Sequence, residues 1–179
     1  MDKHIDFFNY EGCLIYYKGK INSLNQAKMY GEKSLAKPIL LIAVIDSITE
    51  DELVENRIVL TEKLIVRYEK LMKVYSKDLK YYSHTPISNP FWHLQSDGFW
   101  HLYGESCIDI QTNTPSISWI KEHVRYSKLD ESLWIMLQNK EYRSKLREYI
   151  VDYKLKDGTW SGGKVFEGLG TLAALLLIA

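Results

Sequence analysis

The sequence predicts an α+β fold, mainly a helical bundle with a short β-hairpin or small antiparallel sheet. Helical patterns lie towards both ends of the chain, and a turn dipeptide separates two aromatic runs in the middle. The hydrophobic fraction of 46% and charged fraction of 26% are those of a globular protein. We expect residues 1–157 to form a single domain, followed by a glycine-rich linker and apolar tail at 158–179.

The first third of the chain shows three helical patterns. We expect a helix within residues 2–17, a turn at 18–20 and a second helix over 22–30. Pro38 then suits the first turn of a helix, because its missing N–H is not needed there. The run at 39–48 is apolar on nearly all sides, which indicates a central buried helix.

The next stretch combines a strand with a helix. Residues 56–60 are a short strand candidate, and Thr61 can cap the helix that follows. That helix has apolar residues at offsets that match one helical face: Leu64, Ile65, Tyr68, Leu71, Met72 and Tyr75.

Residues 89–102 predict the hairpin. Two aromatic runs at 91–94 and 99–102 flank Asp97-Gly98, a dipeptide favoured in two-residue hairpin turns. In that register His93 faces Leu102 and His101 faces Leu94, so the two histidines point to opposite faces. We expect Trp92, Phe99 and Trp100 to be core residues.

The last third is expected to be mostly helical. Residues 117–124 fit either a strand or a helix. Ser127–Asp130 has the form of a capping box, which would start a helix over 129–139. A strongly charged helix over 140–155 should follow.

Charge and cysteine content narrow the function classes. The 23 basic and 23 acidic residues cancel, which argues against a generally basic nucleic-acid binder. However, acids gather at 46–55, and residues 18–37 hold five lysines against Glu32 alone, so a basic face is compatible with the total. Cys13 and Cys107 are too few to form a disulfide framework. The sequence also shows no apolar leader and no membrane span, so we expect a cytoplasmic protein.

Catalytic motifs are absent from the sequence. His93, His101 and Cys107 lack the spacing of a metal site, so we expect no metal and no cofactor. The His-Asn-His arrangement of an HNH nuclease, nucleophile elbows and phosphate-binding glycine loops are also missing. The sequence therefore predicts a binding module and not an enzyme.

Polar residues in the aromatic region are the best candidates for binding. Asn89, Pro90, His93 and Gln95 lie at the start of an otherwise apolar segment, where they could line a shallow surface depression.

Three blocks together resemble a known family. Lys37-Pro-Ile-Leu-Leu, Asn56-Arg-Ile-Val-Leu and Asn89-Pro-Phe-Trp-His-Leu-Gln-Ser-Asp-Gly-Phe-Trp occur in an order and at a spacing similar to those of the N-terminal sulfur-binding domain of McrA-like HNH restriction endonucleases. The resemblance covers about residues 20–150. It implies a helical bundle with a short sheet and a surface cavity that accepts the sulfur of phosphorothioated DNA.

The resemblance also implies site residues and partners. Pro90 matches the family's cavity proline, His93 stands at a small or variable cavity position, Asn89 where tyrosine is usual, and Lys37 where arginine is common. The implied partners are double-stranded DNA and an HNH nuclease domain in the same or another chain, with no membrane. Two alternatives are a reader of unmodified DNA and a protein-interaction domain that exposes Trp92 and Trp100.

Overall fold

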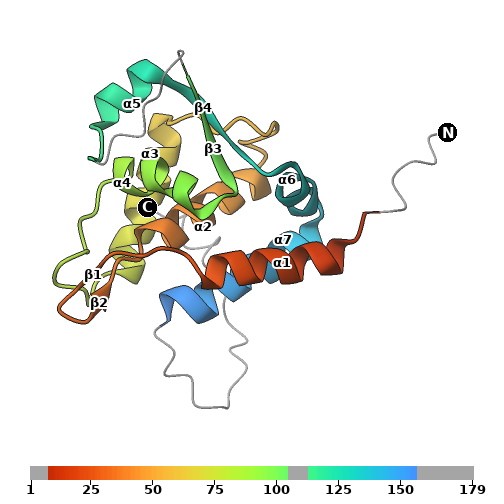
Figure 1. Cartoon of the computed structure of the whole chain (residues 1–179), viewed down its shortest axis with the longest axis horizontal. Coiled ribbons are helices and arrows are strands. Elements are labelled where there is room, and N and C mark those ends of the chain that lie inside the picture. Colours follow the sequence, from red (N-terminus) through yellow and green to blue (C-terminus); the bar gives the residue numbers. More distant parts are fainter. Residues whose placement is uncertain (1–7, 105–112, 157–179) are drawn as a thin grey trace, which may run out of the picture.

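The computed structural model describes residues 8–104 and 113–156, and it has the predicted α+β class with two small antiparallel sheets (Figure 1). The predictions for Cys107 and for residues 158–179 lie outside the described residues. The elements in chain order are α1 (Tyr10–Asn22), β1 (Lys28–Met29), β2 (Glu32–Lys33), α2 (Ala36–Thr49), α3 (Glu62–Tyr75), α4 (Ser88–His93), the 3-10 helix η1 (Leu94–Asp97), β3 (Trp100–Gly104), α5 (Ile117–His123), β4 (Val124–Leu129), α6 (Glu131–Gln138), α7 (Lys140–Ile150) and the π-helical turn η2 (Val151–Leu155).

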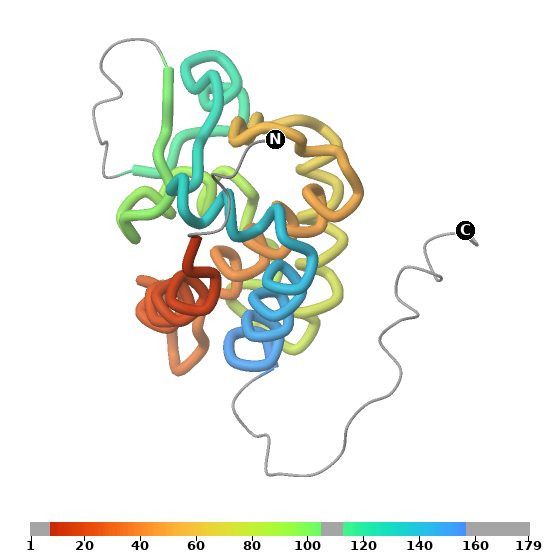
Figure 2. Tube along the Cα trace, turned by 90° about the vertical axis from the view of Figure 1, so that its right-hand side faces the viewer, coloured from red at the N-terminus to blue at the C-terminus, as the bar shows by residue number. Residues whose placement is uncertain are grey.

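Helix α2 is the centre of the domain, which confirms the predicted buried helix. Pro38 lies in its first turn, and residues on all its sides are buried. The helix packs against α3, α4, α6 and α7. Helices α1 and α7 lie side by side on the outside of this core (Figure 2). An all-apolar helix requires neighbours on every side, so α2 organises the rest of the bundle.

Helix α3 also confirms its prediction. The Thr61 hydroxyl accepts a hydrogen bond from the Leu64 amide at 3.2 Å, which caps the first turn. Leu64, Tyr68 and Met72 are buried on the predicted face. The strand expected at 56–60 is reduced to a single bridge, in which Ile58 pairs with a residue of β4.

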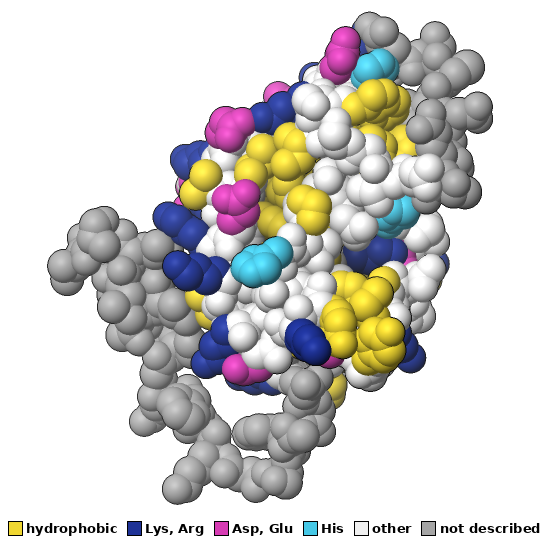
Figure 3. Space-filling view, turned by 90° about the vertical axis from the view of Figure 1, so that its left-hand side faces the viewer, with side chains coloured by type: hydrophobic (Ala, Val, Ile, Leu, Met, Phe, Trp, Pro, Cys, Tyr) yellow, Lys and Arg dark blue, Asp and Glu magenta, His cyan; other side chains and the backbone are white. Residues whose placement is uncertain are grey.

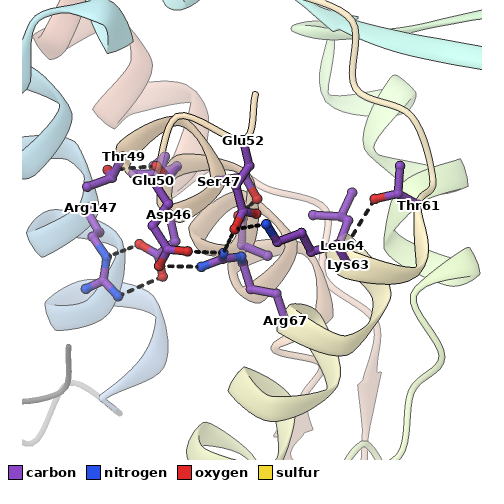
Figure 4. Close-up of polar contacts among 12 residues, drawn as sticks. Asp46, Ser47, Thr49, Glu50, Glu52, Thr61, Lys63, Leu64, Arg67 and Arg147 are labelled. Atoms are coloured by element: carbon purple, nitrogen blue, oxygen red, sulfur yellow. Dashed lines mark hydrogen bonds and ion pairs between the residues drawn. The ribbon is translucent and has the colours of Figure 1, made fainter. Parts of the chain in front are cut away.

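The acidic end of α2 is neutralised by cations of α3 and α7 (Figure 4). Arg147 binds Asp46 with two hydrogen bonds of 2.6 and 3.1 Å. Arg67 binds both Glu50 and Glu52, and its hydrogen bond lowers the pKa of the Glu50 carboxyl. The acids counted at 46–55 are therefore largely compensated where they stand.

The predicted hairpin at 89–102 is wrong, because its first arm is helical. Residues 88–97 form α4 and η1, and Gly98, with a φ of 81°, ends η1 in the left-handed region. The second arm becomes β3, but it pairs with β4, so that Trp100 faces Leu129. Proline near a helix start is favourable, whereas in a ladder it removes a donor. The partner of β3 is β4, a distant segment that no local sequence pattern identifies.

The N-terminal predictions also need correction. Helix α1 runs through residues 18–20, so the expected turn is absent. The helix expected at 22–30 is replaced by the hairpin of β1 and β2, whose turn is formed by Tyr30 and Gly31. Each strand of this hairpin has only two residues, which is too short for an alternation of apolar and polar residues to be recognised in the sequence.

The C-terminal third is helical as expected, with one boundary displaced. Residues 117–123 are the helix α5. Ser127 does not cap a helix, because it lies buried within β4. Asp130 occupies the cap position of α6, but its carboxylate accepts hydrogen bonds from Tyr17 and His101 instead of capping the helix. Helices α6 and α7 otherwise follow the predicted ranges.

The packing of α2 generates a stability prediction. Ile42 is fully buried, so Ile42→Ala should lower the free energy of unfolding by about 2–5 kcal/mol through lost contacts and a cavity. Urea denaturation measures the change. Val66→Ala on the exposed side of α3 is the control and should change stability by less than about 0.5 kcal/mol. A loss for Ile42→Ala as small as the control's would contradict the central role of α2.

Candidate functional site

A buried ion pair connects three segments at the start of α2. The ammonium of Lys37 lies 2.6 Å from Asp97, and the two side chains are only 8% and 5% exposed. The second carboxylate oxygen of Asp97 accepts a hydrogen bond from the backbone N–H of Asn25 at 2.9 Å. Lys37 also donates to the Ser96 hydroxyl at 3.4 Å. The pair thus ties α2 to η1 and to the segment that follows α1.

Helix α4 carries the other candidate residues. Pro90 is buried, whereas Asn89 and His93 are half-buried and one helical turn apart, which places them on one side of the helix. Both reach the hydroxyl of Thr114: His93 Nε2 lies 2.8 Å from it, and the Asn89 amide donates to it at 3.3 Å. Asn89, His93 and Thr114 therefore form one polar cluster on α4.

The electrostatics of the cluster favour a neutral imidazole. Burial lowers the pKa of His93, and the positive charge of Lys37 lowers it further. Because the ordinary value of about 6.5 is already below neutral pH, His93 is uncharged at pH 7. Lys37 is thus close enough for its charge to influence the His93 imidazole.

Gln95 has a different role. Its amide donates to the Trp92 carbonyl at 2.9 Å, which stabilises the junction between α4 and η1. Of the five predicted site residues, the structure thus gathers Lys37, Asn89, Pro90 and His93 around the start of α2 and α4, and it uses Gln95 for a local backbone contact.

Two residues of the site escaped the sequence analysis. The sequence predicts only a turn at Asp97, although an acid beside a hydrophobic run can also pair with a buried cation. Thr114 lies 21 residues from His93 and had no distinguishing signal. Both act through contacts between distant segments.

Trp92 and Trp100 do not form an exposed patch. Trp92 and Trp100 are 1% and 0% exposed, as expected for core residues. Trp100 donates its indole N–H to the Phe91 carbonyl at 2.9 Å, and Trp92 packs edge-on against Trp119. The protein-interaction hypothesis therefore loses the surface on which it depended.

The described residues show neither a metal-binding cluster nor a membrane-spanning helix. Within residues 8–104 and 113–156, no three His, Cys, Asp or Glu side chains gather as metal ligands would. His93 contacts Thr114, whereas His101 binds Asp130 at 2.7 Å, so these histidines belong to different clusters. None of the helices in the described part of the chain has the length and apolarity to cross a membrane.

Comparison with known proteins supports the resemblance. A family model described as ScoMcrA-like, DNA sulfur-binding domain matches residues 17–159. The fold is similar to that of a solved structure described as the sulfur binding domain and SRA domain of ScoMcrA complexed with phosphorothioated DNA, with a TM-score of 0.59 and 14% identity. The match covers 77% of this chain and 42% of the solved chain. This chain therefore spans less than half the length of the solved chain. A search of curated proteins finds no match.

The buried pair generates a second prediction. Asp97→Asn should lower the free energy of unfolding by about 3–5 kcal/mol, because it leaves the Lys37 ammonium buried without a counter-charge. Glu55→Gln removes a carboxylate from an exposed pair and should cost at most about 1 kcal/mol. Chemical denaturation of both variants measures the difference. Equal effects would show that the pair at the base of α2 is not a structural anchor.

The imidazole generates a third prediction. NMR titration should give His93 a pKa below the ordinary 6.5. In Lys37→Met/Asp97→Asn the pKa should rise, because the repulsive cation is gone while burial remains. Since the unfolded chain binds the proton more tightly, the stabilising contribution of His93 is present above pH 6.5 and is lost as the pH falls. An unchanged pKa in the double variant would exclude the influence of Lys37.

Proposed function

Because the chain belongs to the family of ScoMcrA-like DNA sulfur-binding domains, we propose that it binds double-stranded DNA and reads a phosphorothioate at the α4 cluster. The family match over residues 17–159 carries this proposal. It includes α2, α4 and β3, the elements that hold the candidate residues.

The chemistry of α4 suits sulfur better than oxygen. Sulfur is larger and less strongly hydrated than the phosphate oxygen it replaces. It therefore loses less hydration free energy when it enters a partly apolar site. The uncharged His93 offers such a surface on α4, Pro90 adds an apolar ring that is buried in the unbound protein, and the Asn89 amide and Thr114 hydroxyl supply polar contacts beside His93. We propose that these four residues contact the modified linkage.

Lys37 has a supporting role in this proposal. Asp97 already neutralises its charge at 2.6 Å, so it offers little attraction to an approaching phosphate. Its positive charge lowers the pKa of His93 only after the larger effect of burial. The Gln95 side chain supports the α4–η1 junction instead of touching DNA.

The biological setting is part of the same proposal. Residues 1–157 act as one recognition module of a modification-dependent restriction system, in phage defence, with residues 158–179 as linker and tail. Cleavage is supplied by an HNH nuclease domain in the same or another chain, in the cytoplasm where the DNA lies.

Matched duplexes that differ in one phosphorothioate test the proposal. We expect the wild-type protein to bind the modified duplex at least tenfold more tightly in fluorescence-anisotropy titrations, an estimate that corresponds to about 1.4 kcal/mol. Pro90→Ser and His93→Asp should reduce this preference, because they add polarity or charge to the surface that receives sulfur.

His101→Ala serves as the matched control, since His101 binds Asp130 on the sheet and does not reach Thr114. It should retain the preference. Equal affinity of the wild-type protein for both duplexes would make it a reader of unmodified DNA, and no affinity for either would exclude DNA binding.

A further inference from the structure

The β1–β2 hairpin presents an exposed surface of basic and aromatic side chains. This hairpin surface consists of Lys28, Tyr30, Lys33, Lys80 and Tyr81, of which the last two come from the loop after α3. The rings of Tyr30 and Tyr81 lie 5.1 Å apart, and the Lys80 ammonium lies 5.2 Å from the centre of the Tyr81 ring.

The lysines of the strands oppose the stability of the hairpin. Lys28 and Lys33 are direct partners in the antiparallel register, and both are exposed. Like charges at directly opposite positions repel each other and destabilise a two-stranded ladder. Among the described residues, no carboxylate forms an ion pair with either lysine. The pKa of Lys154 is lowered mainly by burial and further by the charge of Lys33, which indicates positive potential in this region.

Tyr30 is also unfavourable for the hairpin itself. Its φ of 47° lies in the left-handed region, where asparagine or glycine is preferred at this turn position. The side chain is 85% exposed, so burial does not offset the strain. A strained tyrosine that projects into solvent indicates a contact with something outside the chain.

Glu32 holds the two parts of the hairpin surface together. Its carboxylate accepts the backbone amides of Lys80 and Tyr81, each at 2.8 Å. The acid is thus bound to backbone donors and does not pair with a lysine. Three cations and two phenols are therefore arranged around one anchored carboxylate.

The hairpin surface lies on the same side of the molecule as α4. In Figure 1 the hairpin and α4 both lie on the left, with the hairpin below α4. Figure 3 views that side and shows exposed apolar patches with Lys and Arg side chains, and some Asp and Glu side chains, near them. Helix α6 and the first part of α7 lie on the right of Figure 1, across the domain.

We propose that the hairpin surface is a second DNA contact, which binds the phosphate backbone of the duplex beside the nucleotide read by α4. This inference rests on the proposed function. Lysine ammonium groups and a tyrosine hydroxyl are suited to phosphate oxygens and carry no base specificity. The hairpin surface supplies the attraction that the neutralised Lys37–Asp97 pair does not, so affinity and sulfur preference come from different elements.

Edge protection is the competing explanation for the lysines. Charged residues on an exposed strand prevent pairing with another chain. That role predicts increased self-association of a lysine-free variant with unchanged DNA affinity.

The first experiment compares two charge-matched double variants on duplexes with and without a phosphorothioate. Lys28→Gln/Lys33→Gln should weaken binding of both duplexes by the same factor, roughly tenfold at moderate salt. It should also reduce the slope of log affinity against log salt by about 1 per lost phosphate contact. Lys140→Gln/Lys145→Gln on α7 removes the same charge and should leave affinity and slope nearly unchanged.

The second experiment separates structure from contact at Tyr30. Tyr30→Asn places a residue suited to the left-handed turn, so the melting temperature should not fall. DNA affinity should nevertheless drop several-fold, because the phenol is lost. A structural role alone predicts equal or better binding.

The outcomes distinguish the two proposals. If the wild-type protein binds neither duplex, the proposed function fails. If it binds and the hairpin variants match the α7 control, only the hairpin contact is excluded. If the hairpin variants lose affinity but keep the sulfur preference, while Pro90 and His93 variants lose the preference, both proposals are supported.

Discussion

The buried pair of Lys37 and Asp97 is the interaction on which the arrangement of the candidate site depends. A lysine at the start of an otherwise apolar central helix requires a counter-charge, because an unpaired ammonium in the interior is strongly unfavourable. Asp97 supplies that charge at 2.6 Å and, through its second oxygen, holds the segment after α1. The position of η1, and of α4 directly before it, follows from this constraint.

Burial and the Lys37–Asp97 pair together shape the electrostatics of the α4 cluster. Since the two charges cancel over a short distance, the base of the cluster has little net charge, while the nearby cation still disfavours protonation of His93. The result is a partly apolar surface with neutral polar groups beside it. The proposed reading of phosphorothioates rests on this surface, because a weakly hydrated sulfur loses less hydration there than an oxyanion.

Charge is divided between opposite parts of the domain. The acids at the end of α2 bind Arg147 and Arg67, whereas the lysines of the β1–β2 hairpin keep their charge exposed. A neutral total therefore hides a basic surface, because compensation is local. This division is what the proposed DNA contact at the hairpin depends on, since the net charge of the chain is zero.

The sequence by itself determined the elements whose signals are local. The apolar run of α2, the cap at Thr61 and the periodic face of α3 specify helices through spacing and side-chain chemistry, and the blocks around Lys37 and Pro90 were enough to indicate the family. Local patterns failed where a choice depended on a distant partner. Tertiary structure alone decided that β3 pairs with β4, and that Asp97 and Thr114 join the site. Strand pairing and burial of charge are interactions between remote segments, and only the packed chain brings those segments together.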